Sequence, residues 1–187
     1  MTPEQAKKIL HNAELLCSAE KVLFAVRRVA DEINERLGDQ QPLVLSVMGG
    51  AVVFTGQLLP LLDFPLDFDY IHVSRYGDNT RGGTISWKIE PHENVRDRTV
   101  LVVDDILDEG ETLNAVREKI LYLGAKAFYS AVFTDKEIGK PKPIVPDFVG
   151  IKLPNRFVFG FGMDISGAWR NLPAIYAIRE QDSGIRS

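Results

Sequence analysis

The sequence predicts an α/β fold, in which a doubly wound and mainly parallel sheet is flanked by helices. Segments typical of strands alternate with segments typical of helices along most of the chain. Two strand-to-helix junctions carry glycine at the turn, namely VMGGAVVF at residues 47–54 and VLVVDDILDEGET at residues 100–112. The end of a parallel strand and the start of the next helix form a common site for anions. We therefore expect the binding chemistry at these two loops.

The composition is that of an ordinary globular protein, with 187 residues, 45% hydrophobic residues and 26% charged residues. This length favours a single domain over residues 1–187. The formal net charge of −4 gives no reason to expect a nucleic-acid partner. No apolar run approaches the roughly 20 residues that a membrane span needs, the amino terminus lacks a signal-peptide core, and the single Cys17 excludes an intrachain disulfide. We therefore expect a cytoplasmic protein without membrane contact.

The first part of the chain predicts two helices, over residues 3–16 and 19–37. Ser18 is a suitable N-cap for the second helix, and Gly38 is a suitable residue at its end. An apolar stripe at helical spacing predicts which face of the second helix is buried. The stripe consists of Val22, Val26, Val29, Ile33 and Leu37.

The next part alternates strand and helix patterns. Apolar runs predict strands at 43–47 and 67–73, and the segment between them predicts a helix over about 51–62. Residues 74–86 (SRYGDNTRGGTIS) are polar and rich in glycine, which favours a mobile loop.

The second glycine-containing junction predicts a buried strand, an acidic loop and a helix. The strand is expected over residues 100–103, and apolar residues at 113, 116, 120 and 123 recur at helical spacing. A further strand is expected at about 126–133, followed by a long connection with proline and lysine at 135–146. Residues 147–179 alternate short apolar runs with turns.

The acidic loop lies where a phosphate would bind, and this combination predicts a ribose phosphate ligand. Asp104 and Asp105 should leave the strand on opposite faces, because side chains alternate along a strand. A carboxylate there can accept hydrogen bonds from vicinal hydroxyls, directly or through Mg²⁺. Thr112 and the amides of residues 108–112 can then hold a phosphate. The alternative is a solvated acidic turn with Gly110 at its bend.

Residues 100–112 resemble the phosphoribosyl-pyrophosphate (PRPP) signature of the type I phosphoribosyltransferases. That signature is an apolar strand, two acidic residues, two aliphatic residues, Asp, any residue, Gly, any residue and Thr. All defining positions match, although position 109 is Glu where Ser or Thr is usual, and position 111 is also Glu. The resemblance implies that Asp108 is the catalytic general base. It implies a PRPP-binding role for Asp104, Asp105, Asp108, Glu109, Gly110, Glu111 and Thr112.

Two other segments resemble pyrophosphate-binding parts of the same family. The loop at Met48 and Gly49 corresponds to the loop whose backbone binds pyrophosphate, although the 6-oxopurine branch usually has Lys where this chain has Met48. Residues 74–86 resemble the flexible lid over the active site. In the lid this chain carries Arg75 and Tyr76 where the purine branch often has Ser-Tyr, and Arg75 could bind pyrophosphate.

The carboxyl region resembles the purine-binding segment of the hypoxanthine-guanine phosphoribosyltransferases over nearly its full length. In that branch a lysine in the place of Lys136 donates to the O6 atom of the base, and an ammonium offers donors only. Phe157 would stack on the purine, and Val158 and Asp164 would meet the base edge. Asp164 would also hold a second Mg²⁺, and Arg170 would grip pyrophosphate.

Together these matches span residues 43–173 and imply a purine-salvage enzyme. It would transfer ribose 5-phosphate from PRPP to N9 of hypoxanthine or guanine, with Mg²⁺ as cofactor. Asp104, Asp105 and Asp164 would be the metal ligands. The family also implies a homo-oligomer, either a dimer or a tetramer. It further implies a core over about 40–150, with a small hood from about 1–38 and 151–187.

Two alternatives remain open at this point. One is a phosphoribosyltransferase for xanthine or another purine; Lys136 argues against adenine, because the 6-amino group is itself a donor. The other is a regulator that uses the same fold to sense PRPP. The acidic balance and the presence of Asp108 argue against the regulator.

Overall fold

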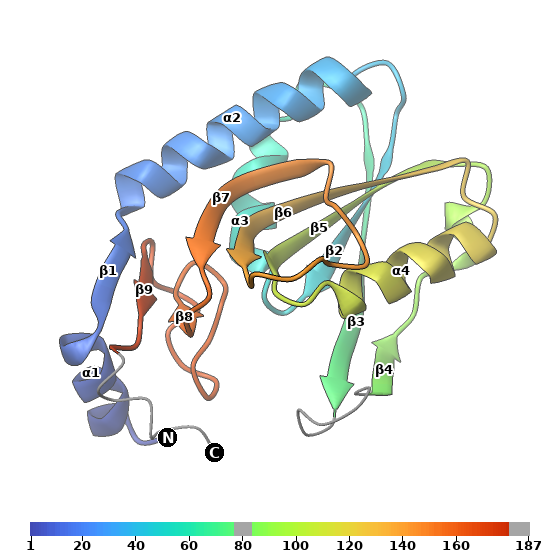
Figure 1. The fold of residues 1–187 in the computed structure, drawn as a ribbon. Helices are drawn as coiled ribbons and strands as arrows, with labels where there is room; N and C mark the ends of the chain where they lie inside the picture. Colours follow the sequence, from blue (N-terminus) through green and yellow to red (C-terminus); the bar gives the residue numbers. More distant parts are fainter. Residues whose placement is uncertain (77–83, 180–187) are drawn as a thin grey trace.

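A computed structural model of the protein describes residues 1–76 and 84–179, and the described part contains one large and one small β-sheet (Figure 1). The large sheet has six strands in the order β4-β3-β2-β5-β6-β7. All neighbouring strands in it run parallel except β3 and β4, which are antiparallel. Its strands are β2 (Leu43–Met48), β3 (Asp67–Tyr76), β4 (Thr84–Ile89), β5 (Thr99–Leu107), β6 (Ala127–Glu137) and β7 (Phe148–Pro154).

Helices cover both faces of the large sheet, as the doubly wound prediction requires. Helices α2 (Ala19–Leu37) and α3 (Val52–Leu58), with the 3₁₀ turn η1 (Leu59–Leu61), lie on one face, and α4 (Glu111–Tyr122) lies on the other. β5 contributes side chains to the hydrophobic core on both faces of the sheet. Leu101 and Val103 pack toward α2, while Val100 and Val102 pack toward α4. The predicted fold class is confirmed.

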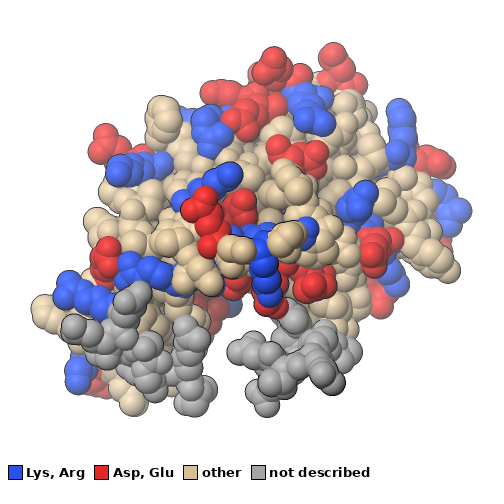
Figure 2. Space-filling model, viewed as in Figure 1, with Lys and Arg blue, Asp and Glu red and all other residues tan. Residues whose placement is uncertain are grey.

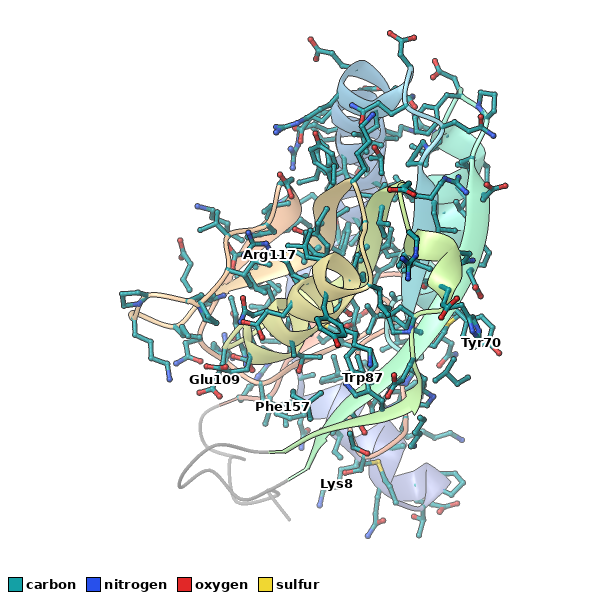
Figure 3. The ribbon with its side chains drawn as sticks, turned by 90° about the vertical axis from the view of Figure 1, so that its right-hand side faces the viewer. Lys8, Tyr70, Trp87, Glu109, Arg117 and Phe157 are labelled. Atoms are coloured by element: carbon teal, nitrogen blue, oxygen red, sulfur yellow. The ribbon has the colours of Figure 1, made fainter. Side chains whose placement is uncertain are left out.

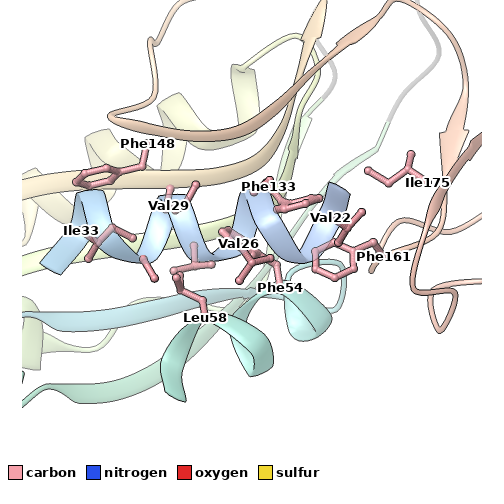
Figure 4. Close-up of a cluster of buried hydrophobic side chains, with 14 of the residues drawn as sticks. Val22, Val26, Val29, Ile33, Phe54, Leu58, Phe133, Phe148, Phe161 and Ile175 are labelled. Carbon is pink, nitrogen blue, oxygen red and sulfur yellow. The ribbon is translucent and has the colours of Figure 1, made fainter. Parts of the chain in front are cut away.

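The apolar stripe predicted on α2 forms the centre of the larger core cluster. Val22, Val26, Val29 and Ile33 are buried in one cluster with Phe133 of β6 and Phe54 of α3 (Figure 4). The rings of Phe54 and Phe133 have centroids 5.1 Å apart. The predicted helix over 19–37 and its buried face are therefore confirmed.

The first helix is shorter than predicted, because a strand begins inside the expected range of 3–16. Helix α1 (Pro3–Asn12) starts at Thr2, which forms a capping box with Gln5, and β1 follows at Glu14–Cys17. β1 pairs with β9 (Ile175–Ala177), which pairs with β8 (Val158–Phe159) to form the small sheet. Residues 14–16 therefore form a strand and not the end of a helix, because their pairing with β9, about 160 residues further along the chain, outweighs their helical propensity.

Three predicted loops also begin or end differently from the prediction. β5 continues to Leu107, so Asp104 and Asp105 lie in the strand and not in the loop. β6 continues to Glu137, well past the predicted end at 133. Residues 74–76 and 84–86 belong to the antiparallel strands β3 and β4, and residues 77–83 lie outside the described part of the chain. In each case ladder hydrogen bonds to a neighbouring strand outweigh the polar composition.

The small sheet brings the two ends of the chain together on one side of the large sheet (Figure 1). Helix α2 lies on the large sheet, where it packs against β7 and α3. The short 3₁₀ turn η2 (Glu93–Val95) precedes β5. The division into a core over about 40–150 and a hood of both termini stays a proposal. Among the described residues, no helix is both long enough and apolar enough to cross a bilayer.

Candidate active site

The candidate residues lie near the carboxyl ends of β2, β5 and β6 and on the loop after β8. Because these three strands are adjacent and parallel, their carboxyl ends share one edge of the sheet. Basic and acidic side chains are interspersed over the face in Figure 2, without one large patch of either sign. Individual ion pairs join residues of the site, among them Lys136 with Asp108 and Arg170 with Asp164.

Asp104 and Asp105 form a coupled acidic pair at the end of β5. Burial first, and then the charge of Asp105, raise the pKa of Asp104 well above its ordinary value. Burial also raises the pKa of Asp105, against the lowering effects of a hydrogen bond with Asp104 and of the Arg170 guanidinium. The two carboxyl groups interact, although neighbouring side chains alternate along a strand. The backbone N–H of Asp105 also donates to Asp104 Oδ1 at 2.9 Å.

The Asp105 carboxylate packs directly on the glycine loop that follows β2. A Cβ atom added to Gly50 would lie 2.0 Å from Asp105 Oδ2, so any side chain there would displace the carboxylate. A Cβ atom on Gly162, whose φ is +98°, would lie 2.1 Å from the Gly50 carbonyl oxygen. These two glycines bring the loop after β2 into close contact with the Asp105 side chain at the end of β5 and with the backbone of the loop after β8. The Met48–Gly49 peptide in this loop is cis.

The predicted phosphate loop has the expected form. Gly110 adopts a left-handed conformation with φ of 86°, and α4 begins immediately after it without a side-chain cap. Its first amides are therefore available to an anion, as the helix dipole favours. Glu111 is exposed and Thr112 is half-buried at the start of the helix. Both residues thus lie where the sequence placed them.

Lys136 and Asp108 form a direct ion pair. Lys136 Nζ lies 2.6 Å from Asp108 Oδ2, and the lysine side chain is only 12% exposed while that of Asp108 is 50% exposed. The sequence placed Lys136 just beyond a strand, whereas it lies within β6. The structure therefore joins the predicted base-binding lysine to the predicted catalytic carboxylate.

Two further lysines, which the sequence analysis missed, reach the same loop. Lys140 Nζ lies 3.0 Å from Glu109 Oε1 on the surface. Lys142 Nζ lies 2.7 Å from Asp135 Oδ1 and donates to the carbonyl oxygen of Leu107 at 2.8 Å. A cavity of about 450 Å³ borders this connection, and its lining includes Leu107 and Lys136. The only sequence signal was the density of lysine in KEIGKPKP, which is ordinary for a surface connection.

Phe157 and Val158 lie at the start of β8, where the small sheet approaches the large one. Val158 is buried and pairs with Ala177, whereas Phe157 is 40% exposed. Phe157 and Glu109 lie on the same side of the molecule in Figure 3, opposite Tyr70. An aromatic ring that is half-exposed on this side is available to stack on a planar ligand.

Asp164 and Arg170 form one compact loop. Arg170 Nη2 lies 2.5 Å from Asp164 Oδ1, and Arg170 Nη1 donates to the Gly162 carbonyl oxygen at 2.6 Å. The other oxygen of Asp164 accepts the N–H of Gly167 at 2.6 Å. The indole N–H of Trp169 donates to the Ala6 carbonyl oxygen at 2.8 Å and so fastens this loop to α1.

The side chains of Arg75 and Tyr76 lie outside the described part of the structure, as do residues 77–83. The expected lid and its contact with pyrophosphate therefore stay predictions. The backbone of both residues belongs to β3.

The acidic residues suit Mg²⁺ chemically, because carboxylate oxygens are hard ligands. Within the described residues, no three acidic, histidine or cysteine side chains gather closely enough to hold a metal on their own. Mg²⁺ is commonly bound by one or two carboxylates together with water and substrate phosphates. The buried pair Asp104 and Asp105 fits that arrangement, in which the substrate completes the site.

Comparison with known proteins identifies relatives over most of the chain. The phosphoribosyl transferase domain matches residues 13–166. The chain is 33% identical over 171 residues to the hypoxanthine-guanine phosphoribosyltransferase of Bacillus subtilis (strain 168). The matched residues cover 90% of this chain and 95% of that protein. It is also 33% identical to the bifunctional protein TilS/HprT of Listeria monocytogenes serotype 4b (strain F2365), but spans only 27% of the length of that protein.

A solved structure shows the same arrangement. The crystal structure of a hypoxanthine-guanine phosphoribosyltransferase from Bacillus anthracis str. 'Ames Ancestor' superposes with a TM-score of 0.80 and 26% sequence identity. The match covers 89% of this chain and 98% of that chain.

Proposed function

Because the chain belongs to the phosphoribosyl transferase family, we propose that it is a purine-salvage enzyme that transfers ribose 5-phosphate from PRPP to N9 of hypoxanthine or guanine. The observation that carries the proposal is the 2.6 Å ion pair between Lys136 and Asp108. It places a pure donor and a carboxylate side by side at the end of the parallel strands. A 6-oxopurine offers O6 to the donor, and a ring N–H to the carboxylate.

Each residue then has a separate task in the transfer. Lys136 turns its ammonium from Asp108 to O6 of the base, and Asp108 accepts the purine proton near N7 as the glycosidic bond forms. Asp104 and Asp105 orient the ribose hydroxyls, and the amides at the start of α4 hold the 5-phosphate. Phe157 stacks on the base, and Arg170 binds pyrophosphate.

Mg²⁺ bound between the substrate and the acidic residues would neutralise the leaving pyrophosphate. Asp104 and Asp105 are the proposed ligands for one ion, and Asp164 is the proposed ligand for a second.

We also propose a homo-oligomer, a dimer or a tetramer. Phe68 and Tyr70 are two residues apart on β3, so they share one face of it, and they are 46% and 43% exposed. Tyr70 lies on the side of the molecule opposite to Glu109 and Phe157 in Figure 3. A partner that covers this face would leave the active site open.

Initial rates with hypoxanthine, guanine, xanthine and adenine, each with and without Mg²⁺, test the proposed function. We expect turnover with hypoxanthine or guanine that depends on Mg²⁺, and little with adenine. A preference for xanthine would identify the protein as a xanthine phosphoribosyltransferase instead. PRPP binding without transfer to any base would favour a regulator.

Replacing Lys136 by Ala should weaken binding of 6-oxopurines and leave PRPP binding nearly intact. Loss of a hydrogen bond to a charged donor costs on the order of 1.5–3 kcal/mol, or about 10- to 100-fold in affinity. The measurement is KM for hypoxanthine at saturating PRPP, with Lys126→Ala on the exposed surface as the matched control. An unchanged KM for the base would remove Lys136 from the base pocket.

Replacing Asp164 by Asn should raise the Mg²⁺ concentration needed for half-maximal turnover, because an amide is a weaker ligand for a hard cation. The near-isosteric Asn can still accept the N–H of Gly167, but it loses the ion pair with Arg170, so Arg170→Lys is measured beside it to separate that loss from the loss of a metal ligand. A titration of turnover with Mg²⁺ measures the effect. A curve identical to that of the wild type would show that Asp164 is not a metal ligand.

A further inference from the structure

Three lysines, one at the end of β6 and two in the connection between β6 and β7, hold three consecutive residues from the end of β5 into the phosphate loop. Lys142 binds the carbonyl oxygen of Leu107, Lys136 binds the carboxylate of Asp108, and Lys140 binds that of Glu109. Gly110 follows directly. An added Cβ there would lie 3.3 Å from Pro143 Cδ and 3.4 Å from Lys142 Cβ, so the connection also packs against this glycine.

Lys142 is set apart from its neighbour Lys140 by burial. The side chains of Lys142 and Asp135 are 12% and 20% exposed, whereas those of Lys140 and Glu109 are 61% and 43% exposed. Exposed pairs contribute little, and removing one partner of a largely buried pair leaves an uncompensated charge. The Lys142–Asp135 pair is therefore the firm attachment of the connection, and the Lys140–Glu109 pair is peripheral.

The buried pair acts at the point where β5 ends. Leu107 and Asp135 are register partners on β5 and β6, and the Lys142 ammonium contacts both of them. The Leu107 carbonyl is the last acceptor of β5 before Asp108, so its direction fixes how the chain enters the loop. Asp135 and Lys136 are neighbours on β6 and point to opposite faces. Asp135 can thus hold Lys142 while Lys136 stays with Asp108.

The geometry points to Lys142, held by Asp135, as a positioning residue that sets the orientation of Asp108 and of the phosphate-binding amides. Its ammonium contacts Asp135 and the carbonyl of Leu107, and it acts through that carbonyl and through the packing of the connection against Gly110. The catalytic consequence rests on the proposed transferase function. The ordering of the loop does not, because it follows from contacts within the chain.

The test compares three variants with the wild type and with Lys126→Met, an exposed control lysine. Lys142→Met removes the cation and leaves Asp135 buried without it. The double variant Lys142→Met with Asp135→Asn removes both charges, so it should recover most of the stability that the single variant loses. Lys142→Arg keeps a cation within reach of both acceptors.

Turnover at saturation, KM for PRPP, thermal unfolding and amide hydrogen exchange of residues 107–113 are measured for each protein. In the double variant we expect an unfolding midpoint close to that of the wild type, but turnover lower by about 10- to 100-fold, as loss of positioning predicts. Exchange in residues 107–113 should be faster, exchange in α2 should be unchanged, and Lys142→Arg should restore most of the turnover.

A merely structural pair would give the opposite pattern. Turnover would recover with stability in the double variant, and exchange in the loop would match the wild type, which would overturn the inference. Should the double variant not fold, Lys142→Gln replaces it, and exchange at the wild-type rate in its loop would be equally decisive. If the wild type transfers ribose phosphate to no base, the proposed function fails, while the exchange rates still decide whether Lys142 orders the loop.

Discussion

Replacing Asp108 by Asn should lower turnover at saturation by ~10²–10⁴-fold, the usual contribution of a positioned proton transfer. A carboxylate at this place can take the purine proton as the new bond forms, and an amide cannot. PRPP binding should change little, because the substitution is nearly isosteric and the amides of the loop remain. Lys136, which lies 2.6 Å from Asp108, would lose its charged partner and be more free to meet O6.

Separate measurements of turnover and of PRPP affinity decide the role of Asp108. Asp39→Asn, an exposed carboxylate just beyond the end of α2, is a control for the chemical change alone. If PRPP affinity collapses in Asp108→Asn while turnover survives, Asp108 is a structural part of the phosphate loop. The general base would then have to be another residue.

Replacing Asp104 by Asn should make the protein more stable at neutral pH and less active. Burial and the charge of Asp105 raise the pKa of Asp104, so the ionised carboxyl destabilises the folded state. Each unit of such a shift corresponds to about 1.4 kcal/mol, and one kcal/mol raises the unfolding midpoint by roughly 2–4 °C in a chain of this size. KM for PRPP should rise by about 10- to 100-fold, because a charged hydrogen-bond acceptor is lost.

The pH dependence of this effect has a definite sign. A raised carboxyl pKa costs the folded state most above that pKa, and the cost disappears as the pH falls toward the unfolded value of about 3.9. Thermal unfolding of both proteins between neutral pH and pH 4 should therefore show the advantage of Asp104→Asn shrinking as the pH falls. An advantage that is independent of pH, or a less stable variant, would contradict the destabilising charge.

Local sequence patterns predicted the helices and turns that are determined by residues close together in the sequence or by a continuous apolar stripe. The stripe from Val22 to Leu37 predicted α2 and its buried face, and the signature around Gly110 predicted the turn into α4. The pattern failed at residues 14–16, because the four-residue run Glu14–Cys17 is too short to distinguish a helix from an edge strand. Only β9, at the far end of the chain, decides between them.

The residues of the candidate site likewise include some that the sequence could identify and some that it could not. Residue types that chemistry requires, such as Asp108 and Lys136, could be named from the sequence, but their direct pairing could not, because it depends on the register of β5 and β6. Lys142 could not be named at all. Its burial is produced by the path of the connection, and nothing local distinguishes it from the exposed Lys140.

The antiparallel pairing of β1 with β9 fixes the order in which the protein can be completed during synthesis. Glu14 is opposite Ala177, so β1 has no partner until β9 has left the ribosome. The six strands of the large sheet end at Pro154 and can associate earlier. The loop with Asp164 and Arg170 depends on Trp169 reaching Ala6 of α1, and its environment is completed only when the small sheet closes. A nascent chain would thus form the turn at Gly110 first and the loop with Asp164 and Arg170 last.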